Sequence, residues 1–403
     1  MGRWLDELKL RARELAQKIP YQQIRDSPSV KYYTDWGVFD RCGDPDIGIT
    51  SDANATVGFD WYEPNIGFVN GSMVMSKLPE GVFALGLNEL GDDYGKFILR
   101  SMDIGESKAL ARHVAGLLGG SYVEVRKDLT EPLRLFVGSS LNSQVLVPTH
   151  HTVVVNDGVR ASLSLFIVNN GGCSSTTVEV YLGKDSALNL LTLSMGNSSP
   201  EYTVIKVISG DNSSLVARTL LIGGSMNHHR EDYVLQGVNS RLNHLGLEIG
   251  LGTSRIDYQV NALHIGGSSS SYSRVLGIAR DKSFIIHRAL GRIMESAKWS
   301  DTNVEGKVFI MNDGAYAASV PVIMVDTGDV NGARHSAADA SPDEEQINYL
   351  RLRGISKDEV TDLIIHELVS QFIESLPETY RADAETLRSL VISNIMKSSV
   401  GPK

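Results

Sequence analysis

Cysteine is scarce in this sequence: its 403 residues include only two, Cys42 and Cys173. A protein built on a disulfide framework needs more, so that class is excluded. Two cysteines far apart in the sequence instead fit the reducing cytoplasm. The length allows one large domain or two to three smaller ones.

Long apolar runs and long basic runs are also missing. Charged and apolar residues alternate through the first twenty positions, unlike a signal peptide, and no window approaches the roughly 18 apolar residues of a membrane span. The formal net charge is −10, and no cluster of Lys or Arg offsets it. Because an acidic surface repels phosphate backbones, we expect neither a nucleic-acid nor a membrane partner, and a cytoplasmic location.

Familiar catalytic motifs do not occur. The sequence contains no GxxxxGK[ST] phosphate loop and no GxSxG nucleophile turn. His366-Glu367 begins like a zinc-protease HExxH motif, but Ser370 replaces the second histidine. No carboxylate pair stands out, so a conventional enzyme is not expected.

Histidines are the other candidates for metal chemistry. Adjacent histidines on a strand point to opposite faces, so His150-His151 and His228-His229 are interpreted as structural or surface residues. Three further histidines could form a ladder on stacked coils, although independent turn or edge positions are favoured: His244, His264 and His287.

What the sequence does contain is a strand repeat. Alternation in 178–182 (VEVYL) and 245–251 (LGLEIGL) predicts strands with one buried and one solvated face. Glycines recur every 12 to 14 residues at positions 158, 171, 183, 196, 210, 223, 237 and 250. This rhythm persists over about 180 residues, which favours a right-handed parallel β-helix over the alternative, a β-sandwich or jelly roll.

Helices are predicted at both ends of the chain. Apolar residues at helical spacing indicate a helix before Pro20, and another is expected over 107–118, ending at Gly119-Gly120. Capping boxes at Ser341 and Ser356 predict two C-terminal helices, the second with an apolar face that includes Leu363, and a third should cover 382–396. The predicted division is a mixed N-terminal region (1–131), a β-helix core (132–340) and a helical domain (341–403).

Residues 321–354 (PVIMVDTGDVNGARHSAADASPDEEQINYLRLRG) carry a family resemblance. They are similar to the end of the SufB/SufD core, with its P-x-L-x-I strand, D-V segment, histidine turn and D-E-E-x-x-F-Y-L-x-S-R-G helix. Leu352 takes the place of the serine in that pattern. Upstream, residues 267–275 (GSSSSYSRV) and His264 resemble the S-x-S stretch of the family.

The resemblance implies a non-enzymatic scaffold for iron–sulfur cluster assembly. Such a scaffold pairs through its last coils, here about 300–335, with a SufB-type subunit or with itself. Its C-terminal helices bind an ABC ATPase of the SufC type. A cluster would be held transiently in the complex, and none is expected on the isolated chain.

This sequence departs from the family at the ligand positions. Ala315 and Ala333 stand where family members carry cysteine, and Ser336 replaces a glutamate. His335 alone is retained; it is either an iron or cluster ligand or a structural turn residue. The chain is therefore expected to be SufD-like, or an ATPase-binding adaptor that has lost the cluster site. A carbohydrate-active β-helix enzyme is the alternative from another class.

Contact with the ATPase is expected from the C-terminal helices. The candidate residues are Tyr349, Leu350, Arg351, Arg353, His366 and Glu367. Helix packing alone would account for the apolar members of this set.

Overall fold

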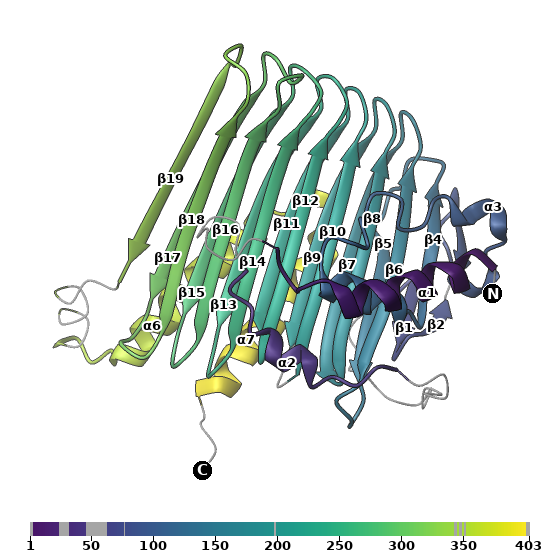
Figure 1. Ribbon diagram of the computed structural model, residues 1–403. Helices are drawn as coiled ribbons and strands as arrows, with labels where there is room; N and C mark the ends of the chain where they lie inside the picture. The colour runs from purple at the N-terminus through teal and green to yellow at the C-terminus, as the bar shows by residue number, and fades with distance from the viewer. Residues whose placement is uncertain are drawn as a thin grey trace.

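The chain folds as a parallel β-helix, in which two sheets face each other across an enclosed lumen (Figure 1). The computed structural model describes residues 3–23, 32–45, 63–75, 77–196, 199–341, 345, 349 and 352–399. One sheet has ten strands in the order β19-β17-β15-β13-β11-β9-β7-β5-β1-β2, and the other has nine in the order β18-β16-β14-β12-β10-β8-β6-β4-β3. Successive strands from β4 onward therefore alternate between the sheets, and each coil contributes one strand to each.

The strands are β1 (Ile66–Val69), β2 (Ser72–Met75), β3 (Val82–Gly86), β4 (Gly119–Val125), β5 (Leu133–Ser140), β6 (Leu146–Val155), β7 (Arg160–Gly171), β8 (Cys173–Leu182), β9 (Ala187–Gly196), β10 (Pro200–Ser209), β11 (Ser214–Gly223), β12 (Met226–Leu235), β13 (Arg241–Gly250), β14 (Arg255–His264), β15 (Ser270–Ala279), β16 (Phe284–Ile293), β17 (Asp301–Ile310), β18 (Tyr316–Val325) and β19 (Gly332–Ala340). The helices are α1 (Arg3–Lys18), α2 (Trp36–Asp40), α3 (Asp92–Gly95), α4 (Lys108–Ala115), α6 (Lys357–Glu374) and α7 (Arg381–Ser399), with short 3-10 turns η2 (Leu87–Glu89) and η3 (Glu378–Tyr380).

The predicted β-helix is confirmed by the strand register. Ser214 in β11 pairs in parallel with Arg241 in β13, one coil later, and the same register continues along both strands. Strands of ten residues joined by short turns produce the 13-residue glycine rhythm seen in the sequence. The sandwich alternative is wrong, because among the described strands only β1–β2 and β3–β4 pair antiparallel.

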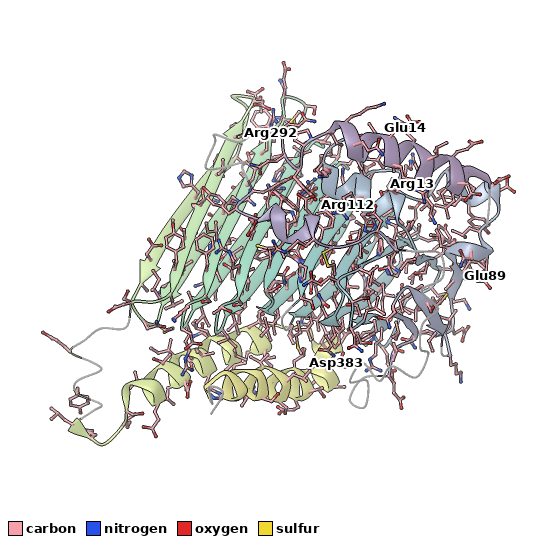
Figure 2. All side chains as sticks on the ribbon, turned by 60° about the horizontal axis from the view of Figure 1, so that its bottom comes forward. Arg13, Glu14, Glu89, Arg112, Arg292 and Asp383 are labelled. Carbon is pink, nitrogen blue, oxygen red and sulfur yellow. A yellow bond between two sulfur atoms is a disulfide. The ribbon has the colours of Figure 1, made fainter. Side chains whose placement is uncertain are left out.

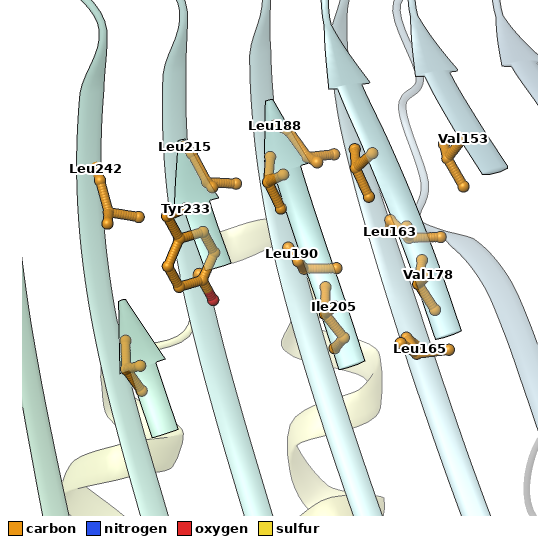
Figure 3. Close-up of a cluster of buried hydrophobic side chains, with 14 of the residues drawn as sticks. Val153, Leu163, Leu165, Val178, Leu188, Leu190, Ile205, Leu215, Tyr233 and Leu242 are labelled. Carbon is orange, nitrogen blue, oxygen red and sulfur yellow. The ribbon is translucent and has the colours of Figure 1, made fainter. Parts of the chain in front are cut away.

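Apolar side chains from both sheets fill much of the lumen (Figure 3). Leu188 and Leu190 of β9 and Ile205 of β10 are among these residues, and each is almost fully buried. Burying one such side chain contributes roughly 1.5–3 kcal/mol, so a repeated apolar position on every coil stabilises the stack.

The outer faces of the sheets are also covered. Helices α6 and α7 pack on the ten-stranded sheet, against Leu247 and Ile249 among others. The N-terminal helices pack on the nine-stranded sheet instead, on the opposite side of the molecule. Figure 2 shows Arg112 of α4 on that side and Asp383 of α7 on the other. The prediction of one solvated face in 178–182 and 245–251 is therefore wrong: Glu179 and Glu248 are as completely buried as their apolar neighbours.

The helix predictions are largely confirmed. Helix α1 ends at Lys18, before Pro20, and Ser356 forms the predicted capping box at the start of α6. Helix α4 ends at Ala115 with Gly116 as its cap, whereas Gly119 and Gly120 already belong to β4. Leu363 is exposed rather than on the buried face of α6, where Ile365 lies instead. Most of the predicted helix after Ser341 lies outside the described residues.

None of the helices within the described part of the chain is both long and apolar enough to cross a bilayer.

The two cysteines are joined in a disulfide, Cys42–Cys173. It links the segment that follows α2 to the first residue of β8, and both side chains are buried. Arg112 of α4 reinforces the link, since its guanidinium donates to the carbonyl oxygens of Phe39 and Cys42 at 2.8 and 2.6 Å. The cysteine count therefore gave no basis for a reducing compartment, because residues 131 apart in sequence are brought together by the fold.

Candidate functional site at the open end of the β-helix

The β-helix has one end at which no further coil follows among the described residues. Strands β18 and β19 are the terminal strands of their sheets, and we call this the open end. The edge of a strand without a neighbour presents unpaired N–H and C=O groups, which makes such an edge a natural place for another chain to bind.

His335 lies on β19 at this end. It pairs with Val304 of β17, whose side chain is buried in the lumen core. Paired residues of parallel strands share a face, so His335 belongs to the lumen-facing set of β19, yet its side chain is exposed. It lies in the middle of a strand rather than in a turn, so the turn interpretation is wrong on location.

The positions flanking His335 provide no soft ligand. Ala333 shares the lumen-facing side of β19, Ser336 is exposed on the other side, and Ala315 lies in the turn before β18. Both cysteines of the chain are used in the disulfide. The described residues contain no group of three or more His, Cys, Asp or Glu side chains placed to hold a metal ion.

A row of polar side chains runs through the lumen to the open end. Its members are in register on every strand of the nine-stranded sheet from β6 to β18: Thr149, Thr176, Thr203, His229, Tyr258, His287 and Ser319. The first six are almost completely buried, and Ser319 is partly exposed. The lumen is therefore lined by apolar side chains at some of the paired strand positions and by polar side chains at this one.

The last two members of the row form a hydrogen-bonded chain with a glutamate. His287 Nδ1 lies 2.8 Å from Glu248 Oε1, and His287 Nε2 lies 2.7 Å from Ser319 Oγ. Glu248 projects from β13 in the facing sheet and has no exposure. Burial raises the pKa of its carboxyl group, and the contact with His287 opposes that effect.

A second glutamate is enclosed deeper in the lumen. Glu231 accepts hydrogen bonds from Tyr233 and Tyr258 at 3.0 and 2.8 Å, and the Nε2 atoms of His229 and His244 lie 3.1 and 3.2 Å from its oxygens. Burial alone would raise the pKa of this carboxyl group, but the hydrogen bonds and charges of the two histidines outweigh burial and lower it. The carboxylate is thus held ionised without contact with solvent.

The paired histidines behave as predicted, with one side chain on each face. His150 points outward beneath α4, where its Nδ1 lies 2.8 Å from Thr177 Oγ1, and His151 points into the lumen toward Ser121. His228 likewise contacts Thr34 outside the sheet, whereas His229 lies inside.

The preferred interpretation of the three separate histidines as turn or edge residues is wrong for His244 and His287, which lie within β13 and β16, whereas His264 is the last residue of β14, next to a turn. His244, His264 and His287 are all completely buried. They do not form a ladder either, because His244 lies in the ten-stranded sheet and His264 pairs with Ile293 rather than with His287.

The C-terminal candidates are spread along a partly described segment. Tyr349 is exposed, and the guanidinium carbon of Arg353 lies 4.7 Å from the centre of its ring. On α6, His366 is half-buried, and Glu367 is exposed and accepts a hydrogen bond from Gln371. Leu350 and Arg351 lie outside the described residues.

Sequence reasoning missed Glu248 and Ser319. The polar row recurs at intervals of 26 to 32 residues, close to twice the glycine spacing, which is the signal that could have revealed it. Glu248 could be matched to His287 only once the two sheets were known to face each other across the lumen.

The lumen glutamates also cannot line a polysaccharide groove, since Glu201, Glu231 and Glu248 have no exposure.

The fold and site define a β-helix protein with helices packed on one sheet and a histidine on the last of its described strands. A family model described as "SUF system FeS cluster assembly, SufBD core domain" matches residues 136–368, more than half of the chain. The chain belongs to this family of iron–sulfur cluster assembly proteins, which confirms the resemblance found in the sequence.

Among individual proteins, the chain is similar to the iron–sulfur cluster assembly protein SufD of Bacillus subtilis, with 27% identity over 129 residues, 32% of this chain and 29% of the relative. It is 26% identical over 145 residues to a SufBD family protein of Staphylococcus saprophyticus, covering 36% and 30% of the two chains. A SufBD family protein of Mycobacterium tuberculosis is 33% identical over 84 residues, 21% of each chain. Each alignment thus spans less than a third of the relative's length.

Proposed function

We propose that this chain is a SufD-like scaffold subunit of the cytoplasmic SUF system, which pairs through its open end and binds a SufC-type ATPase through its C-terminal segment. The observation that carries the first half is the pair of edge strands, β18 and β19, which have no further neighbour among the described residues and lie at the end that also carries His335. A second β-helix end, from a SufB-type subunit or from another copy, would satisfy these edges.

The proposal for the ATPase rests on apolar side chains that the β-helix leaves uncovered. Leu352 is 88% exposed and Leu363 is 56% exposed, although the neighbouring residues of α6 are buried against the ten-stranded sheet. Tyr349 and Arg353, in the segment before α6, are exposed as well, so this part of the chain presents both apolar and cationic side chains.

Co-purification of the full chain with the SufC-type ATPase of the same genome tests this assignment. Leu352→Asp and Leu363→Asp should each weaken binding at least tenfold. Leu10→Asp on α1, which replaces a leucine with an exposure similar to that of Leu363, should not. Point variants are preferable to removal of 341–403, because α6 and α7 bury an apolar face of the sheet. Failure of the intact chain to bind the ATPase would refute the scaffold role.

The pairing of both cysteines favours a more specific form of the proposal. A cluster assembled at the open end would need thiolates that this chain does not supply, so they would come from the partner, with His335 as this chain's contribution. Anaerobic iron and sulfide analysis of the complex, with His335→Ala as the variant, tests that role. Iron content that falls in the variant complex would support this role, and unchanged iron content would contradict it. Absence of iron and sulfide from both complexes would favour the alternative, an adaptor that does not handle iron.

A further inference from the structure

We propose that Ser319 is a nucleophile that accepts an acyl or phosphonyl group, activated by His287 and Glu248. The three side chains are linked in the order required, with the Ser319–His287 and His287–Glu248 contacts at 2.7 and 2.8 Å. These are the separations at which a histidine can act as general base for a serine while a carboxylate orients its ring. The inference is independent of the proposed scaffold function.

The hydrogen-bond network sets the tautomer of His287. When Glu248 is ionised it can only accept, so in that state His287 donates from Nδ1 and its Nε2 lone pair accepts the Ser319 hydroxyl proton. Because His287 and Glu248 are completely buried, water cannot compete for either contact. Of the three hydrogen-bonded side chains, Ser319 alone is partly exposed, and it lies at the open end.

The backbone around the serine packs closely on the Ser319–His287 contact. A Cβ added to Gly306 of β17 would overlap Ser319 Oγ and lie 2.8 Å from His287 Nε2, so this glycine keeps the contact open. Tyr316 N–H donates to the neighbouring coil at Ser283. Since backbone groups alternate sides along a strand, the N–H groups of Ala317 and Ser319 point away from β16, toward the edge of β18.

The chemical step balances within these groups. As Ser319 Oγ bonds to the electrophilic carbon or phosphorus, its proton passes to His287 Nε2, and the imidazolium is stabilised by Glu248. The leaving group departs with the bonding pair: an alkoxide or thiolate takes the proton from His287 and leaves as the alcohol or thiol, whereas fluoride leaves as the anion. The substrate class is an activated ester or thioester.

Labelling of the native full-length chain with a fluorophosphonate probe, followed by peptide mass spectrometry, tests the proposal. We expect one label per chain, on Ser319, in the free chain or in its complex. Ser319→Ala should remove the label, and Ser336→Ala, which alters an exposed serine on the outer side of β19, should retain it.

A second variant separates activation from simple exposure. Glu248→Gln should slow labelling at least tenfold while circular dichroism shows an intact fold. No label on Ser319 in either the free chain or the complex would overturn the inference, as would labelling of Glu248→Gln at the original rate. Neither outcome depends on ATPase binding, so failure here is distinguishable from failure of the scaffold function.

Discussion

The hydroxyl of Tyr380 in η3 lies 2.7 Å from the backbone carbonyl oxygen of Asn189 in β9. It also lies 2.9 Å from the carbonyl oxygen of Leu163, so a single side chain ties the C-terminal helices to two neighbouring coils. Tyr380 is completely buried, and these polar atoms have no access to water.

Tyr380→Phe is therefore expected to lower the free energy of unfolding by about 1–2 kcal/mol, since it leaves buried carbonyl groups without this donor. Urea denaturation of both proteins measures the change. Tyr349→Phe, at an exposed tyrosine, is the matched control and should have no effect. Equal losses in both variants would show that the Tyr380 hydroxyl has no special role.

Reduction of the Cys42–Cys173 disulfide should destabilise the protein. The bond closes a loop of 131 residues, for which the loss of chain entropy in the unfolded state corresponds to about 5 kcal/mol. Thermal denaturation with and without a reductant should show a lower midpoint in the reduced protein. The double variant Cys42→Ala/Cys173→Ala should unfold at the same temperature in both buffers; identical midpoints for the native chain would contradict the pairing.

Stability should fall as the pH drops below about 6.5. Burial lowers the pKa of His151 to about 3 and of His264 to about 4, so below the ordinary histidine value the unfolded chain binds protons that the folded chain does not. Each such histidine contributes up to about 1.4 kcal/mol per pH unit over this window.

Urea midpoints measured between pH 7.5 and 5 check this dependence. His264→Gln should reduce the slope, because one buried imidazole is removed, while His335→Gln replaces an exposed one as the control. A slope that is the same in His264→Gln as in the native chain would count against the assignment.

Gly246→Ala should disrupt the cluster around Glu231. An added Cβ would lie 2.7 Å from Tyr258 Cε1 and 2.9 Å from its hydroxyl oxygen, which donates to Glu231. Overpacking of this kind costs about 1–3 kcal/mol, and loss of a partner of the buried carboxylate adds to it. Differential scanning calorimetry measures the loss, and Gly91→Ala, where a Cβ meets nothing within 4 Å, is the control.

The sequence by itself determined the repeat and the helix caps. Ten-residue strands and short turns impose a 13-residue period that any single coil displays, and the capping box at Ser356 depends on residues within one helical turn. The motif around residues 321–354 identified the family for the same reason, since its members are neighbours in the chain. His335 could be singled out by its place in that motif.

Only the tertiary structure decided which residues meet across the lumen. The pairing of Cys42 with Cys173, and of Glu248 with His287, joins residues far apart in the chain. Which residues meet depends on how the coils stack and on which sheet each strand enters. Alternation in the strands correctly gave two faces, but not that both are buried, because the covering helices come from the two ends of the chain. Strand length and turn residues, which act between neighbours in the sequence, thus determine each coil. The stacking of coils creates the polar row that ends at Ser319.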